Sequence, residues 1–303
     1  MSIRPIKRIV VAKPTMEGAG VRLRRAFGFG STEDFDPFLL FDDFRNDNPA
    51  DFLAGFPWHP HRGIETITYV LSGTVRHGDS LGNHGTLGAG DVQWMTAGSG
   101  ILHQEMPQGD PTGRMHGFQL WANLPSELKM THPRYQDISS KDIPEVTDDD
   151  GTVVRVVCGD FWGQTGPVEG VAADPRYLDV WVPPGRRKTL PVETTRHAFA
   201  YVFEGSGSFR DASGPGGVPT EQVGPSGVGD LVVERTGNRS LVLFDRGDDV
   251  TVQAGDQGIR FLLISGKPIR EPVAWYGPIV MNTPEELRQA YTELQDGTFI
   301  KHR

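Results

Sequence analysis

The sequence predicts an all-β protein made of two small antiparallel barrels in tandem. The first observation behind this fold class is the spread of 38 glycines and 23 prolines along the chain, which is typical of many short strands joined by turns. The second is an internal repeat, in which residues 69–73 (YVLSG) return as residues 201–205 (YVFEG). The third is the length of 303 residues, which suffices for two domains that each bury a core.

The repeat suggests how the chain is divided. We expect a first barrel over residues 1–135, a linker over residues 136–150, a second barrel over residues 151–280, and a helix and tail over residues 281–303. The linker is placed where polar and turn residues gather, and it ends in the acidic run 148–151 (DDDG).

Two pairs of residues in the first barrel have the spacing of metal ligands. His59 and His61 are two positions apart, as are His103 and Glu105. Alternate residues of a strand point to the same face, so each pair presents two donors to one point. Either motif alone recurs by chance, but both lie in strand-like sequence, and Gly-rich turns separate them. In a small barrel these three imidazoles and one carboxylate can surround a single ion.

The second copy is expected to lack this ligand set. Residues 90–92 (GDV) match residues 229–231 (GDL) at a longer spacing, which we assign to an insertion in the Gly/Pro-rich residues 213–219. These offsets place four residues at the ligand positions of the second copy: Pro191, Glu193, Val242 and Phe244. Proline has no side-chain donor, and valine and phenylalanine make an interior apolar. We therefore expect the second barrel to be metal-free and mainly structural.

A single amphipathic helix is predicted near the C-terminus. Thr283 suits the N-cap, Pro284 the first helical position, and Glu286 completes a capping box. Apolar residues then recur at three- and four-residue spacing on one face: Leu287, Ala290, Tyr291 and Leu294. We expect this face to pack on a barrel.

Composition limits the classes of function. The net charge of −9 argues against a whole-chain electrostatic grip on nucleic acid. The first residues are basic but lack the apolar run of a secretory signal, and no stretch approaches the length of a membrane span. The lone Cys158 is compatible with a reducing compartment. These features favour a cytoplasmic protein without direct nucleic-acid or membrane binding.

Long stretches of the sequence resemble the pirins, a branch of the cupin superfamily. The resemblance rests on residues 36–44 (DPFLLFDDF), 59–63 (HPHRG) with 65–66 (ET), 93–98 (QWMTAG) with 100–106 (GILHQEM), 119–121 (QLW), 270–273 (REPV) and 277–283 (GPIVMNT). It covers nearly the whole chain. It implies two cupin barrels of the double-stranded β-helix, or jelly-roll, type with a short C-terminal helix.

The resemblance also implies one non-haem iron ion in the first barrel, held by His59, His61, His103 and Glu105. This set coincides with the set derived from residue spacing. Zinc, manganese, nickel and copper stay open, because these ligand types do not exclude them. Glu65 takes the ligand role in a general cupin pattern. Here it is a candidate for supporting a ligand or facing the substrate, and a structural role is equally compatible with the sequence.

The activity that the resemblance implies is that of a quercetin 2,3-dioxygenase. A flavonol would lose its 3-hydroxyl proton to Glu105, the catalytic candidate, and would then react with dioxygen. The alternative is a non-catalytic, iron-dependent regulator that binds a transcription factor or a metabolic enzyme, as other pirins do. Phe56, Trp58 and Trp94 are candidates for a flavonol pocket, with core packing as the competing interpretation. His116 lies in strand-like sequence and is a further candidate for the cavity.

Overall fold

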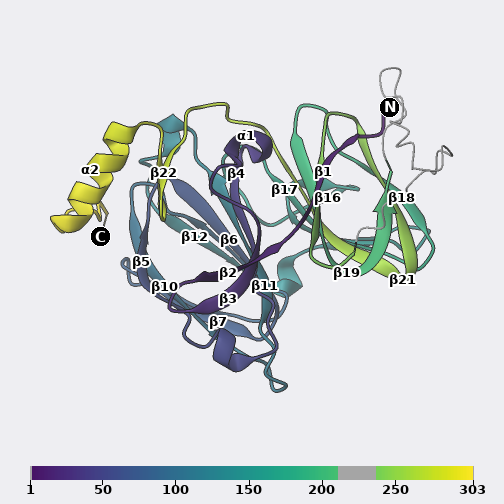
Figure 1. Cartoon of the computed structure of the whole chain (residues 1–303), viewed down its shortest axis with the longest axis horizontal. Coiled ribbons are helices and arrows are strands. Elements are labelled where there is room, and N and C mark those ends of the chain that lie inside the picture. The colour runs from purple at the N-terminus through teal and green to yellow at the C-terminus, as the bar shows by residue number, and fades with distance from the viewer. Residues whose placement is uncertain (1, 211–236, 303) are drawn as a thin grey trace, which may run out of the picture.

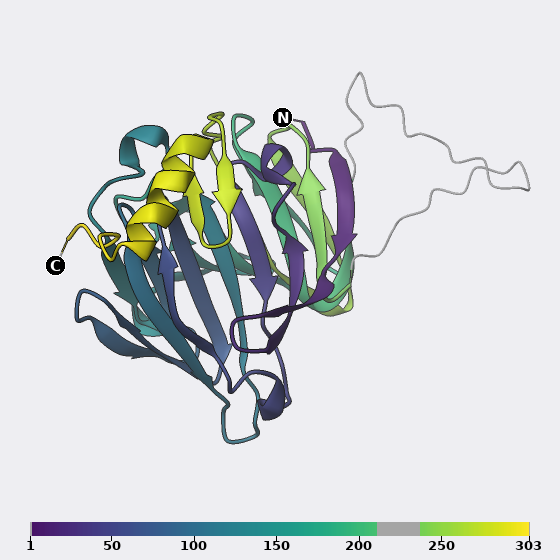
Figure 2. The same ribbon diagram turned by 60° about the vertical axis from the view of Figure 1, so that its left-hand side comes forward.

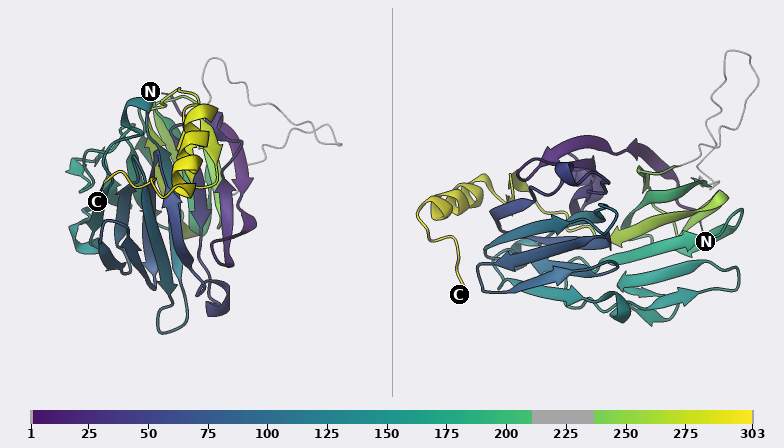
Figure 3. Two further views of the ribbon diagram at one scale, coloured as in Figure 1. Left: turned by 90° about the vertical axis from the view of Figure 1, so that its left-hand side faces the viewer. Right: turned by 90° about the horizontal axis from the view of Figure 1, so that it is seen from below.

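The chain folds into two β-barrels that lie next to each other, which confirms the predicted fold class (Figure 1). The computed structural model describes residues 2–210 and 237–302. In the view from below in Figure 3 the barrels lie side by side, with the C-terminal helix at the outer end of the first. None of the helices in the described residues is long and apolar enough to cross a membrane.

Eleven strands build the first barrel. They are β2 (Lys13–Glu17), β3 (Val21–Phe27), β4 (Phe38–Asp43), β5 (Phe56–His61), β6 (Ile64–Ser72), β7 (Thr74–Asp79), β8 (His84–Leu87), β9 (Val92–Thr96), β10 (Ile101–Gln108), β11 (His116–Asn123) and β12 (Arg134–Ile138). One sheet has the order β12-β9-β6-β11-β4-β3-β2, and the other has the order β5-β10-β7-β8. The short helical segments along this part are α1 (Thr32–Phe35), η1 (Pro49–Asp51), η2 (Ser126–Leu128) and η3 (Ser140–Asp142).

The second barrel takes its strands from both sides of the first in the sequence. They are β1 (Ile6–Val11), β13 (Glu145–Thr147), β14 (Val153–Cys158), β15 (Asp160–Phe161), β16 (Gln164–Thr165), β17 (Arg176–Val182), β18 (Arg187–Pro191), β19 (His197–Phe209), β20 (Ser240–Phe244) and β21 (Asp249–Gly266). The main sheet has the order β1-β20-β19-β21-β17-β14-β13, and β18 pairs with β21. Its interior is an apolar cluster rich in valine, which includes Val180, Val252 and Phe261.

Each end of the chain lies on the barrel that is farther from it in the sequence. Strand β1 pairs with β20, so the first residues belong to the sheet of the second barrel. The hairpin of β22 (Ala274–Tyr276) and β23 (Ile279–Met281), followed by α2 (Pro284–Gln295), packs on the first barrel, as Figure 2 shows. The expected division into residues 1–135 and 151–280 therefore does not separate the two barrels completely. The first range contributes β1 to the second barrel, and the end of the second range packs on the first barrel. The expected linker contains β13 and most of β12.

The predicted C-terminal helix is confirmed, with its cap. The Thr283 hydroxyl accepts the Glu286 N–H, and the Glu286 side chain reaches back to the Thr283 N–H. Ala290 is buried beside Met281 and Phe299, so the apolar face of the helix packs inward as expected.

The expected ligand positions of the second copy need one correction. In the first barrel, His103 on β10 lies opposite His59 on β5. In the second barrel, the strand that pairs with β18 is β21, and Asp249 lies opposite Pro191. Val242 and Phe244 lie instead on β20, which pairs with β19 as β9 pairs with β6.

The wrong register has a simple origin. The expected register depends on residues 229–231 and on the insertion at 213–219, which lie outside the described residues. The neighbours of Asp249 on β21, Val250 and Val252, are fully buried in the apolar interior. Glu193, two residues after the end of β18, lies 3.4 Å from Arg196 in an ion pair, with about half of its side chain exposed. The apolar character expected of this barrel interior is therefore present, but other residues provide it.

Candidate metal centre

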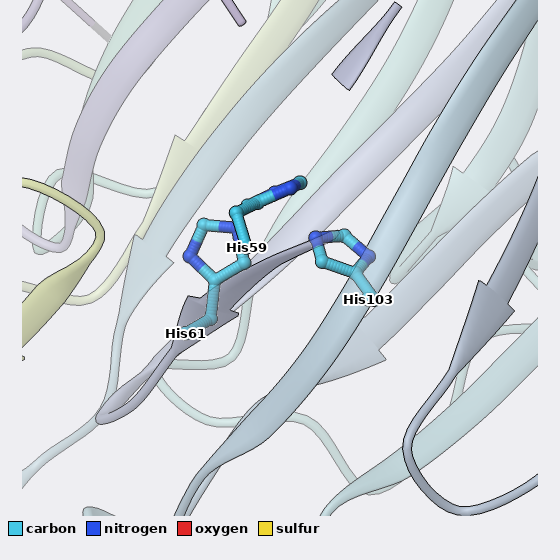
Figure 4. Close-up of side chains that lie close together, drawn as sticks. All are labelled: His59, His61 and His103. Carbon is cyan, nitrogen blue, oxygen red and sulfur yellow. The ribbon is translucent and has the colours of Figure 1, made fainter. Parts of the chain in front are cut away.

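Three histidine side chains converge inside the first barrel (Figure 4). Strand β5 carries His59 and His61, and its antiparallel neighbour β10 carries His103. One nitrogen from each ring lies within 4.8 Å of the others. The ring of His103 is 4.3 Å from that of His59 and 4.9 Å from that of His61, measured between centroids. The three residues that the sequence singles out are thus brought together.

Hydrogen bonds to backbone carbonyls orient two of the rings. The Nδ1 atom of His59 is 2.9 Å from the carbonyl of Pro57, and that of His61 is 3.1 Å from the carbonyl of Pro278. A carbonyl only accepts, so each Nδ1 carries a proton, and in the neutral ring this leaves the Nε2 lone pair for a metal ion. This second contact is typical of metal-binding histidines, because it fixes the tautomer that ligates.

His103 is fully buried, and neither of its ring nitrogens has a hydrogen-bond partner in the described residues. A buried polar atom without a partner costs free energy, and a metal ion would supply one of the two missing contacts. Burial lowers the pKa of His103 and of His61 well below the usual value, and the neighbouring histidines lower it further. Neutral imidazoles are the form that binds metals, so the donor set fits a divalent transition-metal ion.

Glu105 lies on the same face of β10 but is not one of the described residues within the 4.8 Å group. Its register against β5 shifts between His103 and Glu105, so the carboxylate lies opposite Phe56. Its Oε1 accepts a hydrogen bond of 3.1 Å from the hydroxyl of Thr68 and one of 3.5 Å from the amide of Gln119. Both donors hold the carboxylate at the wall of the cavity that His59 and His61 also line.

His59 and His61 line a cavity of about 710 Å³. This volume is within the range of pockets that hold small organic ligands. Besides the carboxylate and the histidines, its walls are mainly aromatic and apolar: Phe29, Leu40, Phe56, Pro57, Trp121, Trp275, Tyr276 and Pro278. The cavity therefore suits an aromatic or apolar molecule with a few polar groups.

One wall of the cavity is charged. Arg25 donates to both carboxylate oxygens of Asp42, at 2.8 and 2.7 Å, and lies 2.8 Å from Glu17. Burial raises the pKa of Asp42 to about 6, although Arg25 acts in the opposite direction. This wall offers carboxylate acceptors and a guanidinium donor to the hydroxyl groups of a ligand.

The sequence matches two family descriptions in succession. The family described as Pirin matches residues 20–122, and the Pirin C-terminal cupin domain matches residues 177–300. Together these matches cover well over half of the chain. The chain belongs to the pirin family.

Relatives extend this pirin assignment over the full length. A pirin-like protein of Caulobacter vibrioides is 45% identical, with 99% of this chain and 100% of the relative aligned. Human pirin is 37% identical over 97% of this chain and 93% of its own length. Among solved structures, quercetin 2,3-dioxygenase from Acinetobacter baumannii superposes with a TM-score of 0.84 at 30% identity, covering 98% of both chains.

Of the two pocket candidates on β5, only one lines the cavity. Phe56 lines the cavity, next to Glu105. Trp58 is 55% exposed and is not among the described residues that line the cavity. Successive side chains of a strand point to opposite faces, so the tryptophan that precedes His59 points away from the metal centre.

Glu65, Trp94 and His116 also lie away from the cavity. Glu65 is 1% exposed and accepts a 2.8 Å hydrogen bond from Thr96. Trp94 is fully buried in the core cluster that both barrels share. His116 contacts Asp47 at 2.6 Å beside a different hollow. The structure therefore supports a packing role for Trp94 and surface or structural roles for the other two.

Sequence reasoning missed several residues of the cavity. Trp121 and Trp275 form its walls, with the Trp121 ring edge-on to His61 at 5.0 Å between centroids. Gln119 and Thr68 hold Glu105. The family resemblance already included residues 119–121 and 277–283, but nothing in their local pattern indicates contact with the histidines.

Proposed function

We propose that this chain is a metal-dependent dioxygenase that opens the central ring of flavonols such as quercetin. The observation that carries the proposal is the convergence of three histidines beside an aromatic-lined cavity whose wall also carries the Glu105 carboxylate. Full-length similarity to a protein described as quercetin 2,3-dioxygenase supports this choice of reaction. In the overall reaction both oxygen atoms of dioxygen enter a ring-opened ester, and one ring carbon leaves as carbon monoxide.

We assign a ferrous ion to His59, His61 and His103, with Glu105 as the fourth ligand. Three imidazoles and one carboxylate leave open positions on a six-coordinate ion, which suits non-haem iron. When bound, the iron supplies Lewis-acid and one-electron redox chemistry. Other divalent ions fit the same donors, so the identity of the metal is part of the proposal.

The protein's own residues position the substrate and receive its proton. Glu105 accepts the proton of the flavonol 3-hydroxyl, and the hydrogen bonds from Thr68 and Gln119 orient its carboxylate for this transfer. Phe56 and Trp121 cover the faces of the flat rings and exclude water.

Turnover of quercetin in air by protein reconstituted with ferrous iron tests the proposal. We expect loss of flavonol absorbance together with carbon monoxide release, and no reaction without dioxygen. His59→Ala/His61→Ala is expected to bind no iron and to be inactive. His84→Ala, which removes an exposed histidine of the same barrel, serves as the matched control. Glu105→Gln is expected to lower kcat by about 100-fold, because the general base is lost.

Either of two results would contradict the dioxygenase assignment: consumption of quercetin without dioxygen, or an unchanged rate in Glu105→Gln. Stoichiometric iron without any turnover would favour the alternative, a protein-binding regulator. Exposed aromatic residues beside the cavity are the observation in favour of that alternative, since such residues are enriched at interfaces. Phe29 and Tyr276, which are 76% and 68% exposed, are the clearest examples.

A further inference from the structure

The strand that carries two of the three histidines is an edge strand. Strand β5 is first in the order β5-β10-β7-β8, so within this sheet it pairs with β10 alone. Its last residue is His61. A strand end paired on one side only needs other contacts to stay fixed. In this protein, several contacts to the residues that follow His61 come from the far end of the chain.

The C-terminal hairpin contacts His61 and the residue after it. The Pro278 carbonyl, in the turn between β22 and β23, accepts from Nδ1 of His61. Two residues later, the N–H of Val280 donates to the carbonyl of Arg62 at 3.1 Å. Gly63 permits this approach, because a Cβ atom there would lie 1.9 Å from the Val280 carbonyl oxygen. The hairpin is thus hydrogen-bonded to the chain immediately around a candidate ligand.

The side chain of Arg62 extends this contact to the C-terminal helix. It is 2% exposed, and its guanidinium lies 2.7 Å from the carboxylate of Glu293 on α2. It also donates to the carbonyl of Phe299 at 2.8 Å and lies 4.2 Å from the centre of that ring. A buried arginine held by a carboxylate, a carbonyl and an aromatic face has little freedom to move.

A buried lysine fixes the same turn from the other side. Lys129 is almost fully buried, and its ammonium donates to the Gly63 carbonyl at 2.9 Å and to the Asn123 side chain at 2.7 Å. Residues 62 and 63 are therefore held between the body of the first barrel and the C-terminal segment.

We propose that residues 274–300, which we call the C-terminal clamp, are a positioning element of the metal centre. Arg62 is the positioning residue through which Glu293 and Phe299 hold His61 in its ligating orientation. Helix α2 thereby sets the affinity of the first barrel for its metal, although no residue of the helix is a candidate ligand. The inference rests on the metal site of the proposed function, but it does not depend on the reaction or its substrate.

Metal affinity and the spectrum of the bound ion test the clamp. Cobalt(II) is the probe, because its visible absorption reports ligand geometry, and a chelator competition gives its affinity. Glu293→Gln is nearly isosteric and removes the negative charge that faces Arg62. Arg62→Lys keeps the charge but loses the planar fork. We expect each variant to bind cobalt about 10-fold more weakly, as is typical when a residue that supports a ligand is changed.

The shape of the cobalt spectrum at saturation separates positioning from general stability. We expect the visible bands to change in both variants, and the double variant to bind no more weakly than the weaker single one, because both act through one contact. Glu285→Gln is the matched control. It lies on the same helix but forms an exposed pair with Arg288, and it should leave affinity and spectrum unchanged.

Wild-type affinity and an unaltered spectrum in Glu293→Gln and Arg62→Lys would overturn the inference. An equal effect of Glu285→Gln would overturn it as well, because the helix would then act only through its stability. Failure of the proposed function looks different. Suppose that the wild type binds cobalt and the clamp variants bind it more weakly, but the wild type turns over no flavonol. The clamp inference would then stand, and the dioxygenase proposal would fail.

Discussion

Glu65 and Thr68 lie three positions apart on strand β6 and face opposite sides of it. Thr68 points into the first barrel and donates to Glu105. Glu65 shares the other face with Ile67 and Tyr69, whose side chains belong to the core between the barrels. One of its carboxylate oxygens has no hydrogen-bond partner in the described residues, and burial raises its pKa to about 7. Its environment therefore favours the neutral acid.

This environment predicts that Glu65 makes stability depend on pH. Its pKa of about 7 in the folded protein is above the ordinary 4.5, so the folded state binds the proton more tightly than the unfolded state. The contribution to stability is present below pH 4.5 and is lost as pH rises through 7, by up to about 3 kcal/mol. Glu65→Gln stays neutral, so we expect it to equal the wild type near pH 5 and to exceed it at pH 8.

Urea unfolding at intervals between pH 5 and pH 8 measures this difference. Asp42, whose pKa is raised to about 6, titrates in both proteins and leaves some pH dependence in the variant. Glu127→Gln, at an exposed position, should reproduce the wild-type curve. A Glu65→Gln curve parallel to that of the wild type would show that Glu65 is ionised throughout.

At the scale of elements, local pattern predicted what lies within one strand or one helix. Two-residue spacing placed His59 and His61 on one face of β5, and the capping pattern placed the start of α2. Contacts between distant elements were not predictable, because periodicity carries no information about which elements meet. The hydrogen bond from His61 to Pro278 joins residues 217 positions apart. Of the two aromatic candidates on β5, Phe56 lines the cavity, whereas Trp58 does not, because it is next to His59 in the sequence but on the opposite face of the strand.

A pair of tryptophans tests this alternation. Trp121 on β11 lines the cavity and packs edge-on against His61, whereas Trp58 on β5 is exposed. We expect Trp121→Ala to raise the KM for quercetin by about 10-fold, because a large aromatic contact with the substrate is lost. Trp58→Ala should stay within about twofold of the wild type, since surface substitutions have small effects. Steady-state kinetics on both variants decide the matter, and equal effects would mean that the cavity is not the substrate site.

At the scale of the whole molecule, the two copies of the repeat meet at a pseudo-symmetric interface. The corresponding rows of paired residues are Asp43, Phe118 and Tyr69 in the first barrel and Asp179, Leu262 and Tyr201 in the second. The hydroxyl of Tyr69 donates to Asp179 and that of Tyr201 donates to Asp43, each at 2.7 Å. The repeated tyrosine of each barrel therefore donates a hydrogen bond to the corresponding aspartate of the other barrel.

This reciprocity predicts matched effects of two substitutions that are far apart in the sequence. Tyr69→Phe and Tyr201→Phe each remove one donor from a buried carboxylate that keeps its arginine partner, Arg260 or Arg45. We expect each to lower the free energy of unfolding by about 1–3 kcal/mol. The shared apolar cluster spans both barrels, so urea should unfold them in one transition that either substitution shifts as a whole. Tyr276→Phe, at an exposed position, should change little. Separate transitions for the two barrels, or a cost at only one tyrosine, would show that the interface is not the symmetric unit that its hydrogen bonds describe.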